Sequence, residues 1–302
     1  MPSGRQEQFA RQMNELLKES RNASVETARR VAAMLEDVRK DIIARIATAK
    51  PESFTHAQLE SLLAEINRQL DHFATRAGQE VEFAQQRQYV RGAELEDKPI
   101  AQITSPPLLA GLDRRRLVLA TGYPATLVTN LADEVRGKLN GELRRAMLGG
   151  QPITDVIDRI SGLLGGATKR AEDIAFTEIN RMQSAGTQSR LEQMAGAVGD
   201  VGGDQIKKEW RHNGIGVPRP GHVRLHGTAV PVNEPFTVEE YANANGQVVD
   251  AEKLMYPRDP AGSPRNTINC HCTVVPHVEV PEWRAGPRHG RLILSEEALV
   301  AA

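Results

Sequence analysis

Aromatic residues make up only 4% of this 302-residue chain, and the chain has only two cysteines. With so few aromatic side chains, the core must be built mainly from leucine, isoleucine, valine, alanine and methionine. Two cysteines exclude a scaffold held together by several disulfide bonds. No run approaches the roughly 18 apolar residues that a membrane-spanning helix requires, so we expect no membrane segment.

An excess of charge of one sign is missing as well. The 38 lysine and arginine residues are balanced by 39 aspartate and glutamate residues, which gives a net charge of −1. At the level of the whole chain, this balance excludes a strongly basic surface for wrapping nucleic acid. The N-terminal segment contains no apolar stretch of the kind found in secretory signals, so we expect folding in a reducing cytoplasm.

Three signatures of common enzyme classes are also absent. The chain contains no GxxxxGK[ST] phosphate-binding loop, no GxSxG nucleophile elbow and no HExxH motif. The sequence therefore predicts neither a P-loop nucleotide hydrolase, nor a serine hydrolase of the α/β type, nor a zinc protease of the HExxH class.

The residue types that are present are distributed unevenly. Six of the eight histidines lie after residue 204, together with both cysteines and both tryptophans. Acidic and basic residues balance in both parts of the chain. The change near residue 200 therefore indicates a change in architecture rather than in charge.

The first two thirds of the chain show the 3.6-residue period of amphipathic helices. We expect a first helix to end before Pro51 and a second to run from Thr55 to about Gly78, as an antiparallel hairpin. A third helix is expected to begin near Pro124, which suits a first helical turn, and to end at Gly149.

Proline and glycine mark further boundaries. A short helix is expected after Pro152, and Gly165-Gly166 is expected to separate it from a longer helix over about residues 168–195. Residues 92–112 contain three prolines and little periodicity, which predicts a loop or hinge. The glycine-rich stretch 196–204 predicts a flexible joint.

After this joint, short β-branched segments separated by turn residues are typical of strands. The expected strands are 206–210, 222–227, 228–232, 247–249 and 267–275. The segment 239–244 is expected to form one helical turn.

These elements predict an α+β protein, in which an elongated, mostly helical N-terminal two thirds precedes a small β-containing C-terminal domain. The expected segments are a helical hairpin or arm at 1–91, a hinge or linker at 92–123, a helical part at 124–200, a small α+β domain at 205–280 and a tail at 281–302.

The small C-terminal domain contains His222-x-x-x-His226 and Cys270-x-Cys272. Imidazole and thiolate are ligands of tetrahedral Zn²⁺, so these four side chains predict a structural zinc site, with His271 as a further candidate ligand. On a helix the two histidines would share a face, whereas on a strand they would lie about 13 Å apart, too far for one ion unless the chain turns between them. Alternatively, the cysteines are small core residues and His222 is hydrogen-bonded inside the domain.

Other polar groups have both a structural and a functional interpretation. Asp259, Asn266 and Asn269 are typical of turns, although Asp259 beside His222 would make an acid–base pair. On the long helix, Glu178 is spaced to pair with Arg181, as part of a solvated face or of a clamp to the next domain.

Two arginine runs, Arg114-Arg115-Arg116 and Arg144-Arg145, suit either phosphate contact or a solvated surface.

Several short motifs follow one another in the last third of the chain. They are Lys207-Lys208-x-Trp210, Arg219-x-x-His222-x-x-Leu225-His226-Gly227, Phe236, Tyr256-Pro257-x-Asp259-Pro260 and Ile268-Asn269-Cys270-x-Cys272. The segment 170–182, with its Thr177-Glu178 pair, precedes them. In this order and spacing they resemble the phage head-morphogenesis family, the minor head proteins typified by the F protein of phage Mu. The resemblance covers roughly residues 115–275.

The resemblance implies a virion component, present at low copy number at the portal vertex of the head and assembled in the host cytoplasm. The implied partners are the portal protein, the major capsid or scaffold protein, and packaged DNA, and no established enzymatic activity accompanies the family. The positions that match the family's motifs are Thr177, Glu178, Trp210, Arg219, Gly227, Asp259, Pro260 and Asn269. A domain of about 75 residues gains little stability from burial alone, which favours a structural zinc ion as its one cofactor.

The leading hypothesis is therefore a non-enzymatic minor head protein that acts in head assembly and in packaging or ejection of DNA. One alternative is a metal-dependent nuclease or other hydrolase that uses His222, His226 and Asp259. Another is a non-specific DNA-binding factor ejected with the genome, which would require a local arginine patch on this nearly neutral chain.

Overall fold

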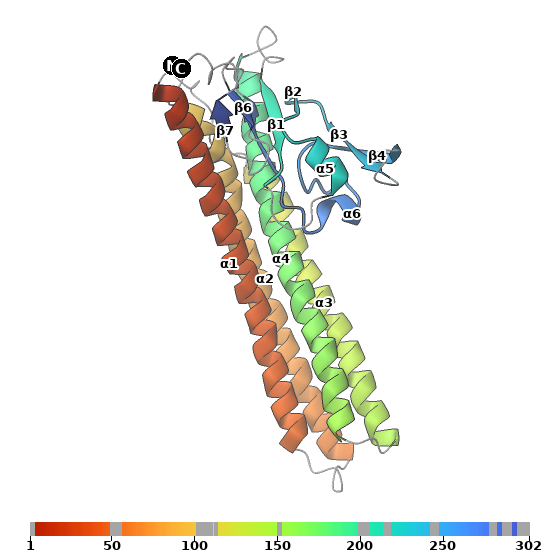
Figure 1. Ribbon diagram of the computed structural model, residues 1–302. Coiled ribbons are helices and arrows are strands. Elements are labelled where there is room, and N and C mark those ends of the chain that lie inside the picture. Colours follow the sequence, from red (N-terminus) through yellow and green to blue (C-terminus); the bar gives the residue numbers. More distant parts are fainter. Residues whose placement is uncertain are drawn as a thin grey trace. The chain divides into compact units, whose positions relative to one another are not determined.

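The computed structural model describes residues 4–48, 56–100, 111, 114–149, 153–198, 206–213, 219–241, 248–277, 283–285 and 292–294. Four long helices come first (Figure 1): α1 (Gly4–Thr48), α2 (His56–Ile100), α3 (Arg114–Gly149) and α4 (Ile153–Val198). None of the described helices is both long enough and apolar enough to cross a membrane.

Short strands and two short helices follow. They are β1 (Lys207–Arg211), α5 (Pro220–Arg224), β2 (Ala229–Pro231), β3 (Phe236–Tyr241), β4 (Val248–Leu254), α6 (Pro264–Thr267), β5 (Thr273–His277), β6 (Trp283–Ala285) and β7 (Leu292–Leu294). The predicted α+β class, with helices in the first two thirds and a small antiparallel region after them, is confirmed.

The chain divides into two compact units, and each long helix contributes residues to both. The first unit comprises Met1–Ala23, Gln85–Leu117 and Ile179–Ala302, and the second comprises Ser24–Ala84 and Val118–Glu178. The predicted division of the chain into five segments stays a prediction.

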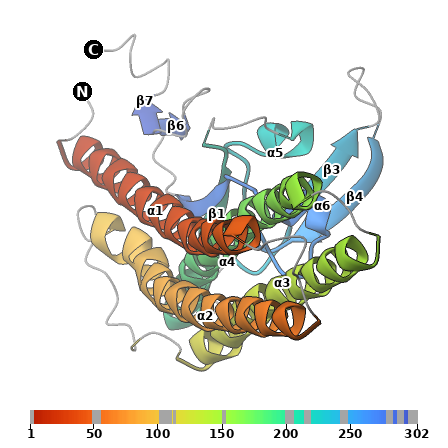
Figure 2. The same cartoon turned by 90° about the horizontal axis from the view of Figure 1, so that it is seen from below.

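In the second unit, segments of all four helices run side by side, and Figure 2 shows them from below. Apolar residues three or four positions apart give each helix one buried stripe, as the period predicted. The buried residues include Val31, Leu35, Ile42, Ile66, Leu70, Phe73, Leu131, Leu139, Ile160 and Leu164.

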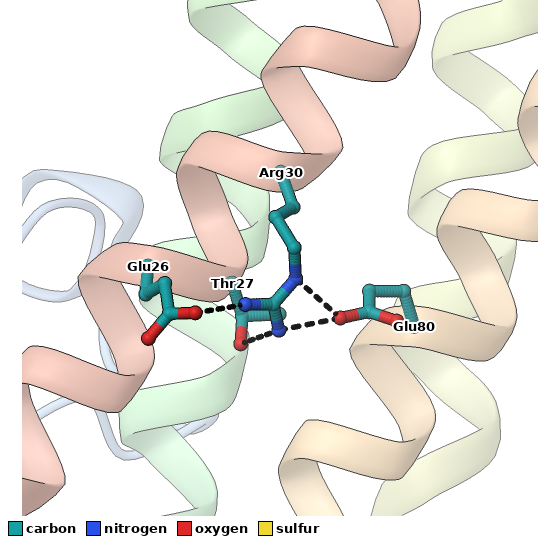
Figure 3. Close-up of polar contacts among 4 residues, drawn as sticks. All are labelled: Glu26, Thr27, Arg30 and Glu80. Atoms are coloured by element: carbon teal, nitrogen blue, oxygen red, sulfur yellow. Dashed lines mark hydrogen bonds and ion pairs between the residues drawn. The ribbon is translucent and has the colours of Figure 1, made fainter.

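Charged side chains link these helices at their solvent-exposed rims. Arg30 of α1 donates from Nε to Glu80 Oε1 of α2 at 2.9 Å, and it also binds Glu26 and Thr27 on its own helix (Figure 3). The side chains of Arg30 and Glu80 are 46% and 29% exposed. A pair so accessible to water contributes little to stability, so the buried stripes hold the bundle together.

The predicted helix break at Gly165-Gly166 is wrong, because α4 continues through both glycines. Two glycines in a helix interior cost about 2 kcal/mol relative to alanine. The apolar stripe nevertheless runs across them without a change of period, from Ile160 and Leu164 to Ala167 and Ala171, all of which are buried. Burial of a continuous stripe outweighs the low helix propensity of the two residues.

Two other predicted helix boundaries are also wrong. The helix expected to end near Gly78 continues to Ile100, so the loop expected over 92–112 is helical at 92–100. The helix expected to begin near Pro124 begins at Arg114, because the arginine- and leucine-containing segment before the proline has good helix propensity. The expected hinge is described between these helices only at Gly111, and the expected joint at 196–204 is helical at 196–198.

In the first unit, β1 is the central strand of an antiparallel sheet ordered β2-β1-β5, and β3 pairs with β4 as a separate hairpin. The core beside them contains Trp210, Phe236, Val238, Leu254, Cys270, Cys272 and Val274. Two of the few aromatic residues, Trp210 and Phe236, thus provide much of the volume of this core.

The structure corrects three predictions in this unit. The strand expected at 267–275 begins only at Thr273, because Thr267 ends helix α6 and residues 268–272 form no strand. Residues 220–224 form helix α5 and not the strand expected at 222–227, because Pro220 at the first helical position favours a helix. Residues 239–241 belong to β3 and not to a helical turn, because they pair with β4. The predicted tail is described only at β6 and β7, which pair with each other.

Helices α2 and α4 come unusually close together within the first unit. A Cβ atom on Gly92 would lie 2.1 Å from Gln183 O, and one on Gly186 would lie 2.1 Å from Tyr89 O. These distances are far inside van der Waals contact, and both obstacles are backbone atoms that cannot rotate away. Glycine at both positions therefore permits the crossing.

We expect Gly186→Ala to lower the free energy of unfolding by about 3 kcal/mol or more, since the helices must separate to admit the methyl group. Gly162→Ala on the same helix is the matched control. Nothing lies within 4 Å of its Cβ position, so alanine there should stabilise the protein by up to about 1 kcal/mol. Urea unfolding of the two variants compares these effects, and equal stabilities would contradict the close crossing.

A lysine is buried in the small domain. The Lys208 ammonium donates to Gln188 Oε1 at 3.1 Å and to Met255 O at 2.8 Å, and it lies 5.4 Å from the centre of the Phe236 ring. Burial lowers the pKa of Lys208 from 10.5 to about 8, although nearby carboxylates oppose the shift.

Between about pH 8 and 10.5 the unfolded chain therefore binds the Lys208 proton more strongly than the folded protein does. We expect the free energy of unfolding contributed by this residue to rise with pH across that interval. This rise in the free energy of unfolding amounts to about 3 kcal/mol at most, and Lys208→Met should remove it. Urea unfolding of both proteins as a function of pH tests this, and parallel pH profiles would contradict it.

Candidate metal centre

The structure brings together three of the four predicted metal ligands. The ligand atoms of His222, Cys270 and Cys272 all lie within 4.8 Å of one another, and among the described residues this is the one such group. All three side chains are buried. His222 comes from α5, whereas the cysteines lie between α6 and β5.

Local backbone geometry explains how His222 reaches this place. Pro220 opens the short helix α5, and the helix packs tightly against β3, where a Cβ on Gly221 would lie 2.1 Å from Glu239 O. The chain then turns at Gly227, whose φ of 79° is in the left-handed region that favours glycine.

A second turn brings in the cysteines. Asn269 has a φ of 53°, and asparagine is among the few residues other than glycine that adopt this conformation readily. The Cys270 N–H then donates to Thr267 O at 3.3 Å, at the end of α6. The predicted turn role of Asn269 is thus what directs the Cys-x-Cys segment into the core.

The distances fit a tetrahedral ion. His222 Nδ1 lies 3.4 Å from Cys270 Sγ and 3.6 Å from Cys272 Sγ. With Zn–S about 2.3 Å and Zn–N about 2.0–2.1 Å, tetrahedral coordination separates nitrogen and sulfur by about 3.5 Å. Imidazole and thiolate are also the ligand types that Zn²⁺ prefers. The three residues therefore have the spacing and the chemistry to hold a metal.

The tautomer of His222 is set by a chain of side chains behind it. The Asn266 side chain hydrogen-bonds to the Glu252 carboxylate, which directs its amide N–H₂ toward Glu252 and its Oδ1 toward His222. His222 Nε2 lies 3.3 Å from that Oδ1 and so carries the proton. The lone pair is then on Nδ1, which faces both sulfurs. Such outer partners commonly orient metal-binding histidines.

The two thiols differ in acidity. The pKa of Cys270 is lowered mainly by a hydrogen bond from Cys272, with further contributions from His222 and Arg258 that outweigh burial. The pKa of Cys272 is raised because it holds that shared proton and is buried. The pair therefore favours one thiolate, and a metal ion that binds both sulfurs would release the remaining proton.

Arg258 supports the cysteine segment from behind and has a φ of 67°. Its Nη1 donates to Cys270 O at 2.5 Å and to Cys272 O at 2.7 Å, and its Nη2 donates to Asn180 O and to Ser184 Oγ at 3.0 Å each. The buried guanidinium thus fixes both ligand-bearing residues to helix α4.

Trp210 of β1 forms one wall of the site. Its ring contacts His222 and Phe236 edge-on, with ring centres 5.3 Å apart in both cases. Its indole N–H has no oxygen or nitrogen acceptor in the described part of the chain and points toward the Cys272 sulfur. A buried N–H directed at sulfur stabilises the thiolate form, which is the form that binds metal.

His226, the fourth predicted ligand, does not join this group. Its Nδ1 accepts the backbone N–H of His212 at 3.0 Å, so the neutral ring carries its proton on Nε2 and has no free lone pair for an ion. The two histidines would share a face only on one continuous helix, but α5 ends at Arg224 and His226 lies in the turn that follows.

The predicted pair of Asp259 with His222 is not formed either. Asp259 accepts the backbone N–H groups of Met255 and Ala261, at 2.8 and 2.9 Å, and so builds the turn that contains the exposed Pro260. Arg219 likewise has a structural contact, a hydrogen bond to Ile268 O at 2.6 Å. The described geometry thus provides His222 with an amide and two sulfurs, but with no carboxylate.

The other motif residues lie on α4. Thr177 and Glu178 are buried, so the solvated face expected there is wrong. Arg181, the expected partner of Glu178, donates from Nε to Arg258 O at 2.8 Å.

Sequence reasoning missed two residues of the site. The sequence predicts a turn at Asn266 and assigns no role to Arg258, the residue before Asp259, and no pattern in the sequence indicates that they face the ligands. The one available signal is their proximity to the Cys-x-Cys pair along the chain.

Fold and site together define a class of protein: mostly helical, with a small antiparallel C-terminal region that contains a buried His/Cys/Cys group. Residues 137–275 match the family described as Phage Mu protein F like protein. This match confirms the predicted resemblance over that segment. It includes all of α4 and every residue of the metal centre.

The chain is also similar to a curated protein named Uncharacterized protein YqbB, from Bacillus subtilis (strain 168). The two are 30% identical over 139 residues, which is 45% of this chain and 40% of YqbB. The similarity therefore spans less than half of either protein. No solved structure matches this chain.

Proposed function

We propose that this protein is a minor head protein of a phage, a virion component that acts in head assembly at the portal vertex. The Mu F-like match over residues 137–275 carries the proposal, because that segment contains the motifs from which the resemblance was predicted. The proposed partners are the portal protein and the major capsid or scaffold protein. The proposed role is structural, and it extends to packaging or ejection of DNA.

Within this proposal the C-terminal domain contains one structural zinc ion. His222, Cys270 and Cys272 would hold it, and the ion would link α5 to the cysteine segment. Structural zinc contributes directly to the folding of small domains, whose cores bury little area. Burial of all three ligands supports a structural role, since a catalytic ion needs a position open to substrate.

The hydrolase alternative has no support from the geometry. It requires a carboxylate beside His222, and both oxygens of Asp259 are occupied by backbone N–H groups. Nothing in the comparisons favours it either, and we do not propose it.

Direct contact with DNA through Arg144 and Arg145 is also disfavoured. Arg144 lies 3.1 Å from Glu60, and Arg145 lies 2.6 Å from Glu142. These carboxylates compete with phosphate for the same guanidinium groups. Contact with packaged DNA therefore remains part of the proposal without an assigned residue.

Co-sedimentation with procapsids tests the proposed function. Procapsids assembled with and without the portal protein of the same phage would be incubated with the full chain and separated by density. We expect co-sedimentation only when the portal protein is present. Failure to associate with either particle would contradict the proposal, and equal binding to both would move the site of action away from the portal vertex.

A further inference from the structure

The zinc ion proposed above requires one more ligand than the described group provides. Structural zinc sites are almost always four-coordinate with protein ligands, and here His222, Cys270 and Cys272 give only three. The centre is buried, so a solvent molecule in the fourth position would be enclosed by the domain core. The neighbouring elements should therefore supply the fourth side chain.

Strand β1 directs one further histidine toward the site. Side chains alternate between the two faces of a strand, so Lys208, Trp210 and the residue at position 212 share a face. Trp210 on that face contacts His222 directly, with the two rings edge-on. His212 follows the last residue of β1 and is half-buried. The alternation therefore places it on the side of the metal centre.

Two hydrogen bonds hold the segment 212–213 against the ligand-bearing turns. The His212 N–H donates at 3.0 Å to Nδ1 of His226, a residue that lies four positions after His222. The Asn213 side chain donates at 2.6 Å to the backbone oxygen of His271, the residue between the two cysteines. The backbone at His212 is thus tied to both segments that carry the known ligands.

Electrostatics agree with this placement. Burial lowers the pKa of His212, the charges of His226 and His222 lower it further, and the charge of the Cys270 thiolate opposes the shift. These contributions agree with a position of His212 near His222 and Cys270.

The other candidates in the described chain are less suitable. Nδ1 of His226 already accepts a backbone hydrogen bond. The sulfurs of Cys270 and Cys272 converge on one group, so the side chain between them, that of His271, is directed elsewhere. Asp259 binds two backbone N–H groups.

We propose that His212 is the fourth metal ligand, which completes a site of two histidines and two cysteines with His222, Cys270 and Cys272. The inference rests on the zinc ion of the proposed function. The ligand atoms of His222, Cys270 and Cys272 lie within 4.8 Å of one another, and the ring of His212 is not part of this group. The His212 side chain must therefore turn toward the two sulfurs when an ion binds.

The test compares zinc affinities of full-length variants by competition with a chelator. We expect His212→Ala to weaken zinc binding by about 100-fold or more, beyond the 10- to 100-fold typical of outer-shell changes. The matched control, His271→Ala, should change it less than about 10-fold. His226→Ala removes the hydrogen bond to the His212 N–H and should weaken zinc binding less than His212→Ala does. The absorption spectrum of the Co²⁺-loaded protein gives a second readout: in His212→Ala the d–d bands should shift, while the thiolate charge-transfer band keeps its intensity.

Each outcome has a distinct meaning. Wild-type affinity and an unchanged cobalt spectrum in His212→Ala would overturn the assignment while leaving the three-ligand site intact. A large loss in His226→Ala or His271→Ala, with His212→Ala unaffected, would assign the fourth position to that residue instead. Absence of zinc binding by the wild-type chain would contradict the zinc proposal itself and is therefore distinguishable from failure of this inference.

Discussion

The Cys270→Ser variant is expected to lose its zinc ion and, with it, the cooperative unfolding of the C-terminal domain. A serine hydroxyl does not replace a thiolate as a zinc ligand at neutral pH. Structural zinc supplies about 10–16 kcal/mol of apparent binding free energy in small zinc domains, which is comparable to the whole stability of a protein domain. The core around the site depends on few large side chains, chiefly Trp210 and Phe236.

Two measurements check this prediction: metal content after gel filtration, and thermal unfolding followed by tryptophan fluorescence in a Trp283→Phe background, which leaves Trp210 as the one tryptophan. Val274→Ala is the matched control, because Val274 is buried in the same core but provides no ligand. It should lose stability through a cavity, by about 1–3 kcal/mol, and keep its metal. If Cys270→Ser instead behaves like the wild type in both measurements, the cysteines are ordinary core residues.

The second large effect is expected for Arg258→Met. The change removes a guanidinium that is only 2% exposed and leaves four acceptors without their donor, the carbonyls of Cys270, Cys272 and Asn180 and the hydroxyl of Ser184. A buried acceptor that loses its partner costs about 1–3 kcal/mol. We expect the free energy of unfolding to fall by about 3 kcal/mol or more, and zinc affinity to fall with it.

Urea unfolding and chelator competition measure these two losses. Arg219→Met is the matched control, because Arg219 also donates to a carbonyl, Ile268 O, but at an exposed position. Arg219→Met should lower the free energy of unfolding by no more than about 0.5 kcal/mol. Similar stabilities of the two variants would show that the buried contacts of Arg258 do not hold the cysteine segment in place.

The helical architecture could be predicted from the sequence wherever a boundary signal coincides with the end of an apolar stripe. The third helix ends at Gly149 as expected, because no stripe continues beyond it. Gly78 and Gly165 lie within apolar stripes that continue beyond them, and the helices do not end at these two glycines. Propensity is a local property, whereas burial of a stripe depends on the neighbouring helices.

The site could be predicted in part. Residue chemistry identified His222, Cys270 and Cys272, which the fold brings together. His226 was included because its spacing from His222 fits one helical face, a condition that fails because α5 ends two residues before it. The supporting roles of Arg258 and Asn266 depend on contacts with distant segments, and one sequence contains no signal for such contacts.

The metal content of the purified full-length protein tests the central claim, that residues 205–280 form a zinc-stabilised domain, most directly. Elemental analysis after extensive dialysis, combined with native mass spectrometry, gives the identity and the stoichiometry of the ion. One zinc per chain, removed by a chelator together with the folded signal of Trp210, is the result we predict. A cooperatively folded domain that contains no metal and does not respond to added zinc would contradict it.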